Sequence, residues 1–212
     1  QGEAERLALM FNRRIAGHPL ARALSIHFLP CVVYEIKERN YPGGIAWMLA
    51  EPELEGVFTK WNNNAGHVRR TPPPPPTRHP PALGRGSLGL GMINEDDEDD
   101  EDDEDEDYND QGRADTARSE EDLYETSPQA FSHFTYDATH GKELVCDLQG
   151  VWNATDGFTM TDPVIHHVSR TGRRHTNGAT DKGADGILNF FKTHRCNQLC
   201  QFLGLQAKGE GC

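Results

Sequence analysis

The chain has 212 residues, of which 35% are apolar, and a formal net charge of -13 at pH 7. An acidic run at residues 95–107 accounts for that charge, because the acidic residues outside it equal in number the 21 lysines and arginines. The rest of the chain is therefore close to neutral, which argues against a nucleic-acid-binding protein, and the lack of a long apolar run argues against a transmembrane helix.

The first third of the chain predicts one helix and a pair of strands. Apolar residues recur at helical spacing between Glu3 and Ile15, so we expect an amphipathic helix that ends near Gly17. β-branched and aromatic residues between Ile26 and Ile36 favour one or two strands. A turn at residues 40–44 leads into a predicted buried strand, 45–49, which we expect to pair with residues 31–36 as a hairpin.

A short connector and a long unstructured segment follow. Lys60 and Asn64 are four residues apart, so they share one face if the connector is helical. The alternative is a solvated lysine followed by an asparagine-rich loop. Residues 71–127 combine a polyproline run, a glycine-rich stretch and the acidic run, a composition that predicts a disordered insertion.

The second half begins with a predicted hairpin and a set of oxygen ligands. Two runs rich in strand-forming residues, 131–136 and 143–145, flank a turn at residues 140–142. Strand alternation would place Asp147 and Gln149 on one face, and Asp162 follows shortly before a proline. Carboxylate and amide oxygens together suit a magnesium phosphate site. The alternative is that Asp147 ends a strand and Asp162 caps a turn.

A cluster of metal-ligating residues lies near the end of the chain, after a predicted helix with an apolar stripe at residues 187–191. His194, Cys196 and Cys200 supply three ligands within seven residues, and we expect a helical turn to place both sulfurs on one side. A structural zinc site needs a fourth ligand. Ten histidines are available and the residues alone do not select one of them, although expected burial in the predicted hairpin makes His133 attractive. The alternative is a pair of buried thiols on a core helix.

The compartment and one further loop can also be judged from composition. Five cysteines, an odd number, favour a reducing compartment, and the charged first six residues are not typical of a signal peptide. We therefore expect a cytoplasmic protein without membrane contact. The loop from Gly178 to Gly183 is bounded by glycines, which allow a backbone to approach a ligand or a partner chain closely.

Several uncommon motifs occur in one order: Ser132–Tyr136, Asp147–Val151, Thr161–Pro163, Gly178–Gly183, Asn189–Cys200 and Leu203–Leu205. Together they resemble the carboxy-terminal lobe of the alpha-kinase family. The members of this family are atypical serine/threonine protein kinases. Upstream, Leu7–Asn12 resembles the helix of the other lobe and Glu51–Lys60 resembles the hinge. The resemblance covers nearly all of the chain outside the insertion.

The resemblance implies an α+β, two-lobed protein-kinase-like fold, with a truncated amino-terminal lobe and a zinc-stabilised carboxy-terminal lobe. The corresponding boundaries are 1–70 for the partial first lobe and hinge, 71–127 for the insertion, 128–206 for the second lobe and 207–212 for a tail. Residues Val151 to Met160 are more than the family motif leads us to expect, so we predict a longer loop before Asp162.

The resemblance also implies roles for individual residues. Glu51 and Leu54 would hold adenine, and Lys60 and Asn64 would lie beside the phosphates of ATP and its metal. Asp147 would be the catalytic aspartate, with Gln149 and Asp162 as Mg²⁺ ligands in the same catalytic set. His133, His194, Cys196 and Cys200 would hold a structural Zn²⁺, and the loop from Gly178 to Gly183 would help to place the protein substrate.

The function implied is transfer of the γ-phosphate of ATP to serine or threonine of a protein substrate. The family's glycine-bearing hairpin and strand lysine come before the motifs matched here, and the chain begins after them. The alternative function is therefore a zinc-stabilised binding module, or pseudokinase, without catalysis.

Overall fold

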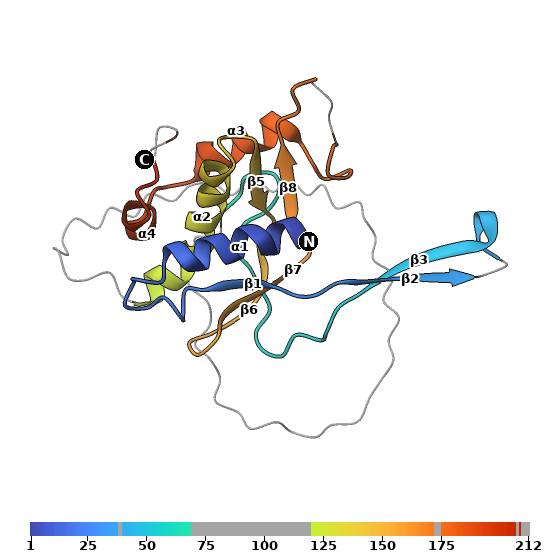
Figure 1. Cartoon of the computed structure of the whole chain (residues 1–212), viewed down its shortest axis with the longest axis horizontal. Helices are drawn as coiled ribbons and strands as arrows, with labels where there is room; N and C mark the ends of the chain where they lie inside the picture. Colours follow the sequence, from blue (N-terminus) through green and yellow to red (C-terminus); the bar gives the residue numbers. More distant parts are fainter. Residues whose placement is uncertain (38–39, 69–119, 172–174, 207, 209–212) are drawn as a thin grey trace, which may run out of the picture. The chain divides into compact units, whose positions relative to one another are not determined.

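The computed structural model describes residues 1–37, 40–68, 120–171, 175–206 and 208. Most of the predicted insertion, residues 71–119, lies outside the described residues. The described part contains both helices and strands, which confirms the expected mixture (Figure 1). None of its helices is long and apolar enough to cross a bilayer.

A four-stranded sheet of order β1-β7-β6-β4 carries the centre of the fold. Its strands are β1 (Ile26–Phe28), β7 (Gly157–Thr161), β6 (Gln149–Asn153) and β4 (Thr59–Lys60). β1 runs parallel to β7, whereas the β7–β6 and β6–β4 pairs are antiparallel. The segment 151–160, expected as a loop, is therefore largely a β6–β7 hairpin.

The described residues also form two separate two-stranded sheets. β5 (Glu143–Cys146) pairs antiparallel with β8 (Val164–His167), and β2 (Val32–Lys37) pairs antiparallel with β3 (Ile45–Ala50). A short 3-10 turn, η1 (Pro42–Gly44), precedes β3. The β2–β3 hairpin confirms the predicted pairing, but the predicted burial is wrong, because Trp47 and Leu49 are 66% and 68% exposed.

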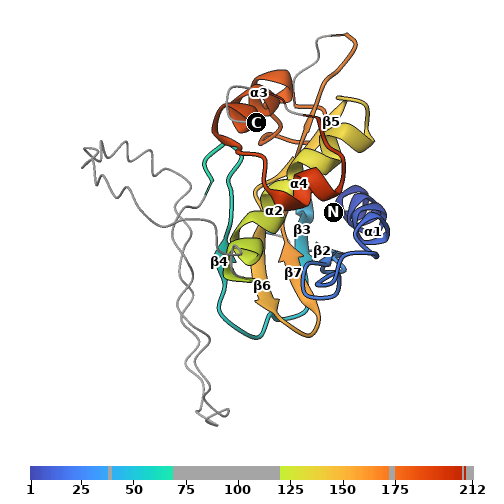
Figure 2. The same cartoon turned by 90° about the vertical axis from the view of Figure 1, so that its left-hand side faces the viewer.

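Three of the helices in the described residues pack against strands, and α4 packs against α2. α1 (Gly2–Arg14) contacts β1 and α2 (Glu120–Ala138), which in turn contacts β5 and α4 (Gln198–Phe202), and α3 (Gly183–Thr193) contacts β8. Figure 2 shows α4 lying against α2. The apolar stripe of α1 is buried at Leu7, Ala8 and Phe11, so the predicted helix and its packing face are confirmed. The helix predicted around residues 187–191 is confirmed as α3.

The largest correction concerns residues 131–136, which are helical and not a strand. Phe131, Ser132, His133, Phe134 and Thr135 are all buried, since α2 lies between α1, β5 and α4. A helix buried on every side shows no amphipathic period, so strand-forming residue types misled the prediction. α2 also includes residues 120–127, and Tyr124 is buried in the core, so the predicted insertion ends before this helix.

Candidate functional site

A row of predicted site residues crosses the sheet from β4 through β6 to β7. Lys60 is in register with Gln149, and Gln149 with Thr161, so the three side chains lie on one face of the sheet. Lys60 Nζ lies 2.7 Å from Asp147 Oδ1. At the other end of the row, Thr161 donates its hydroxyl hydrogen bond to Glu51 Oε2. Residues far apart in the sequence therefore meet on one surface.

The two predicted catalytic carboxylates stand on unusual backbone conformations. Asp147 has φ 59° and Asp162 has φ 42°, both in the left-handed region that non-glycine residues seldom adopt. Such conformations carry a cost and concentrate at functional sites. The left-handed Asp147 lies between β5 and β6, outside both strands, so strand alternation is not what orients its side chain. Its ion pair with Lys60 still brings it to the surface that carries Gln149.

The close approach of β6 to β7 explains why a glycine, Gly150, follows Gln149. Its φ is 151°, and a Cβ added there would lie 2.1 Å from the carbonyl oxygen of Thr159 on β7. At this position, next to Gln149, only a residue without a side chain allows β6 to lie so close to β7.

Asn62 is a site-supporting residue that the sequence reasoning did not single out. Its side chain is buried, and its Oδ1 accepts a hydrogen bond from the backbone N–H of Leu148 at 2.9 Å. Its Nδ2 donates to Gln129 Oε1 at 2.9 Å and to Ser132 Oγ at 3.2 Å. Leu148 lies between Asp147 and Gln149, so Asn62 fixes the backbone that carries both. The triple asparagine at 62–64 was the only available signal.

The connector that carries Lys60 and Asn64 is not helical. Lys60 ends β4 and Asn64 lies in the loop after it, so the helical spacing considered for this pair is wrong. Glu51 is half-buried and accepts from Gln1 Nε2 at 2.5 Å through Oε1, while Leu54 is also half-buried. Asn64 is connected through its backbone oxygen, which lies 3.1 Å from Nε2 of His166.

The glycine-bounded loop from Gly178 to Gly183 is anchored by Asp181. Its buried carboxylate accepts hydrogen bonds from the backbone N–H groups of His167 at 3.0 Å, Gly183 at 2.8 Å and Asn177 at 3.0 Å. Burial raises the pKa of Asp181, but the three backbone N–H donors lower it by more, so the net shift is downward. The glycines have φ 108° at Gly178 and 62° at Gly183, as the loop requires.

The four predicted zinc ligands come together. One ligand atom from each of His133, His194, Cys196 and Cys200 lies within 4.8 Å of all the others. The contacts measure 3.1 Å from His133 Nδ1 to His194 Nε2 and 3.7 Å from Cys200 Sγ to His194 Nε2. A tetrahedral zinc about 2.0–2.3 Å from its ligands would separate them by roughly 3.3–3.8 Å. Cys196 is disulfide-bonded in this structure, so the four residues fit the metal only once that cysteine is reduced.

Protonation states also fit a metal centre. His133 Nε2 contacts the carbonyl oxygen of Gln206 at 3.0 Å, which keeps the hydrogen on Nε2 and leaves Nδ1 as a lone-pair donor toward the cluster. Burial, with the charges of His133 and Arg195, lowers the pKa of His194 to about 3. The thiol of Cys200 is the exception, because burial raises its pKa to about 11 and a metal would have to displace its proton on binding. Two details differ from the prediction, since His133 lies on α2 and Cys196 precedes α4.

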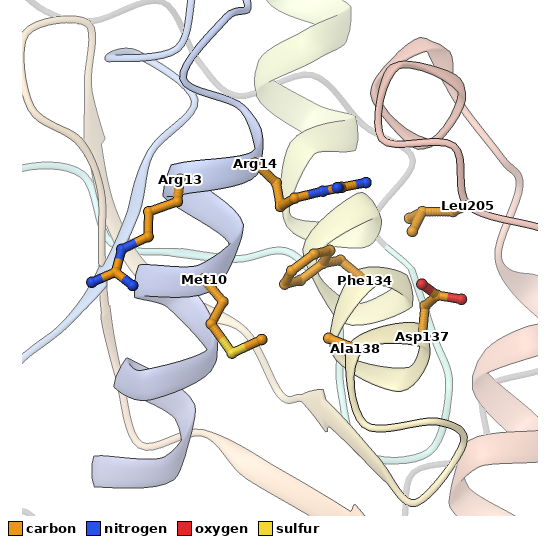
Figure 3. Close-up of a pocket in the computed structure, with 7 residues that line it drawn as sticks. All are labelled: Met10, Arg13, Arg14, Phe134, Asp137, Ala138 and Leu205. Carbon is orange, nitrogen blue, oxygen red and sulfur yellow. The ribbon is translucent and has the colours of Figure 1, made fainter.

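A pocket of about 420 Å³ is lined by residues that belong neither to the sheet row nor to the set of four metal ligands. It is lined by α1, α2 and the segment after α4, and Figure 3 shows the side chains of Arg14, Phe134 and Leu205 at this junction. None of the residues predicted to bind ATP lines it. The pocket therefore does not correspond to the predicted nucleotide site.

Comparison with known proteins gives one consistent result. A model of the alpha-kinase family matches residues 1–80 and 102–200. Alpha-protein kinase 1 of Dictyostelium discoideum is 40% identical over 182 residues, which is 86% of this chain and 9% of that protein. Myosin heavy chain kinase B of the same organism is 29% identical over 182 residues, 86% of this chain and 16% of that protein.

The fold is similar to a solved structure as well. The alpha-kinase domain of Myosin-II heavy chain kinase A in complex with AMP-PNP gives a TM-score of 0.59 at 27% identity, covering 98% of this chain and 54% of that one. The chain thus spans about half of that domain, and less than a fifth of the two curated relatives.

Proposed function

The chain belongs to the alpha-kinase family, and we propose that it provides the catalytic surface for transfer of the γ-phosphate of ATP to a serine or threonine of a protein. The observation that carries the proposal is the row from Glu51 through Thr161 and Gln149 to Lys60, with Asp147 paired to Lys60 at 2.7 Å. It brings a cation, an amide and carboxylates to one surface.

We propose that ATP lies along this row. Glu51 and Leu54 would contact the adenine end, and Lys60 and Asn64 would lie beside the phosphates. This places a positive side chain where the phosphates carry their charge. The Myosin-II heavy chain kinase A domain was solved with AMP-PNP, which supports a nucleotide in the family fold.

The transfer step would use Asp147 at the hydroxyl of the substrate. The hydroxyl oxygen forms a bond to the γ-phosphorus while the bond to the ADP oxygen breaks, and the hydroxyl proton passes to the Asp147 carboxylate. Lys60 would hold that carboxylate in place. Gln149 and Asp162 are the residues that would hold Mg²⁺, which neutralises charge on the phosphates when bound.

We further propose that His133, His194, Cys196 and Cys200 hold a structural Zn²⁺. With its cysteines reduced, the cluster has four ligands, which leaves no open position for substrate and so favours a structural role. The metal would join α2 to the segment from His194 through α4. The division into two lobes, with 1–70 in the first and 128–206 in the second, is part of the same proposal, as is the placement of a protein substrate by the loop 178–183.

The test is transfer of labelled γ-phosphate from MgATP to a basic protein substrate, with Asp147→Ala and Asp162→Ala beside the unchanged protein. Asp156→Ala is the matched control, because Asp156 lies in the exposed β6–β7 turn and its side chain makes a 3.8 Å ion pair with the exposed Arg22. We expect transfer to be lost in the first two variants and kept in the third. Transfer that survives Asp162→Ala would refute the assignment, and nucleotide binding without any transfer would favour the non-catalytic binding module.

A further inference from the structure

His166, on β8, is buried and hydrogen-bonded through both ring nitrogens. Nδ1 accepts from the backbone N–H of Lys182 at 3.1 Å, and Nε2 lies 3.1 Å from the backbone oxygen of Asn64. A backbone N–H only donates and a carbonyl oxygen only accepts, so Nδ1 carries no hydrogen and Nε2 carries one. The imidazole is therefore neutral and in a single tautomer. Burial is the main cause that lowers the pKa of His166, and a lowered pKa agrees with a neutral imidazole.

The His166 ring is buried, and α3 approaches it closely on one side. A Cβ added at Gly186 on α3 would lie 2.3–2.7 Å from three atoms of the His166 ring. The first turn of α3 therefore presses directly on the imidazole, and a glycine at this position is required by that contact. A ring confined in this way transmits a displacement of one neighbour to the other instead of absorbing it.

The two backbone groups that His166 joins belong to different loops. Asn64 lies in the loop after β4, which is organised by its own contacts, since Asn63 Oδ1 accepts from the backbone N–H groups of Ala65 and His67. Lys182 lies in the glycine-bounded loop 178–183, which Asp181 anchors to β8. Each loop thus has internal support, and His166 contacts both.

We propose that His166 is a positioning residue that couples the loop of Asn64 to the loop 178–183, so that nucleotide binding at the first orders the second for a protein substrate. This inference rests on the proposed function, which places ATP phosphates beside Asn64 and the protein substrate beside residues 178–183. Coupling requires an element whose arrangement both sites bias, and the confined imidazole, bonded to one backbone group of each loop, provides it.

Two substitutions of His166 each remove one of its two hydrogen bonds and keep the other. In His166→Asn the amide oxygen can replace Nδ1 and keep the bond from Lys182, while the side chain is too short to reach Asn64. In His166→Gln the amide nitrogen can replace Nε2 and keep the bond to Asn64, while the acceptor for Lys182 is lost. His167→Asn is the matched control, since that neighbouring ring pairs with Glu143 at 3.1 Å and is only partly buried.

The experiment is amide hydrogen exchange of the intact protein with and without the probe AMP-PNP plus Mg²⁺. In the unchanged protein and in His167→Asn, we expect the probe to slow exchange by at least about fivefold in both segments, 62–67 and 178–183. In His166→Asn and His166→Gln, the response should persist in 62–67 and disappear in 178–183. Without nucleotide, the Lys182 amide should exchange faster in His166→Gln than in His166→Asn.

The outcomes separate this inference from the proposed function. A response of the unchanged protein in 62–67 alone overturns the coupling and leaves the nucleotide site standing. A response of both segments that survives both His166 variants also overturns it. If neither segment of the unchanged protein responds, the nucleotide site itself is wrong and the coupling fails with it. A general loss of folding in a variant would appear as faster exchange in α1 and α2, which the proposal does not predict.

Discussion

Replacement of Asn62 by alanine tests whether the buried amide holds the backbone between the two central site residues. The change removes the acceptor of the Leu148 N–H and the donor to Gln129 and Ser132 in a site that is 2% exposed. An unpaired buried N–H costs about 1–3 kcal/mol, and the lost donor contacts with the small cavity add to it, for a total of about 2–4 kcal/mol. We expect the melting temperature to fall by roughly 4–16 °C.

The same substitution should reduce catalysis beyond its effect on stability. Leu148 connects Asp147 to Gln149, and a displacement of about 1 Å at a reacting group can lower a rate roughly 100-fold. Phosphate transfer measured well below the melting temperature, where the variant is folded, should therefore show a lower kcat. A normal kcat in folded Asn62→Ala would refute a positioning role.

Asn153→Ala is the matched control for stability. The stability of both variants is measured by thermal unfolding, monitored by far-UV circular dichroism. Asn153 Oδ1 also accepts two backbone hydrogen bonds, from Thr155 at 2.9 Å and Asp156 at 2.8 Å, but in an exposed turn. Water can replace that acceptor, so the expected loss is below about 1 kcal/mol. Equal losses in the two variants would show that burial of Asn62 does not matter.

Three further predictions concern the sheet, the metal cluster and acid stability. Gly150→Ala should lower the free energy of unfolding by more than about 3 kcal/mol, because its Cβ would lie 2.1 Å from the Thr159 oxygen at φ 151°. Gly2 has open space around it, so Gly2→Ala should leave the free energy unchanged in the same unfolding assay. Removal of bound zinc from the reduced protein by a chelator should lower the melting temperature by about 5 °C or more, and re-addition should restore it; an unchanged melting temperature would contradict a structural zinc. The lowered pKa of Asp181 means that its carboxylate stabilises the fold above the unfolded pKa of about 3.9, and this contribution is lost as the pH falls through the folded value. Asp181→Asn should therefore be less stable than the unchanged protein at neutral pH, and the difference in urea-unfolding free energy should shrink below about pH 4; a constant difference would contradict the mechanism.

Local patterns were the part of the fold that could be read in advance. α1 and α3 have one buried face and one exposed face, so their apolar spacing repeats every helical turn and predicts them directly. The pairing of β2 with β3 follows from a short turn between two strand-forming runs. α2 could not be predicted, because burial on all sides removes the pattern and leaves residue types that suit a strand equally well.

By itself, the sequence determined the residue types of the site: the carboxylates and amide of Asp147, Gln149 and Asp162, and the soft ligands of the metal cluster. These follow from motifs whose chemistry is local. Only the tertiary structure decided that Lys60 meets Asp147, that Asn62 holds Leu148, and that His166 joins two loops. Those contacts join residues far apart along the chain, and no periodicity or spacing records them, because they arise only when sheet register and helix packing bring the segments together.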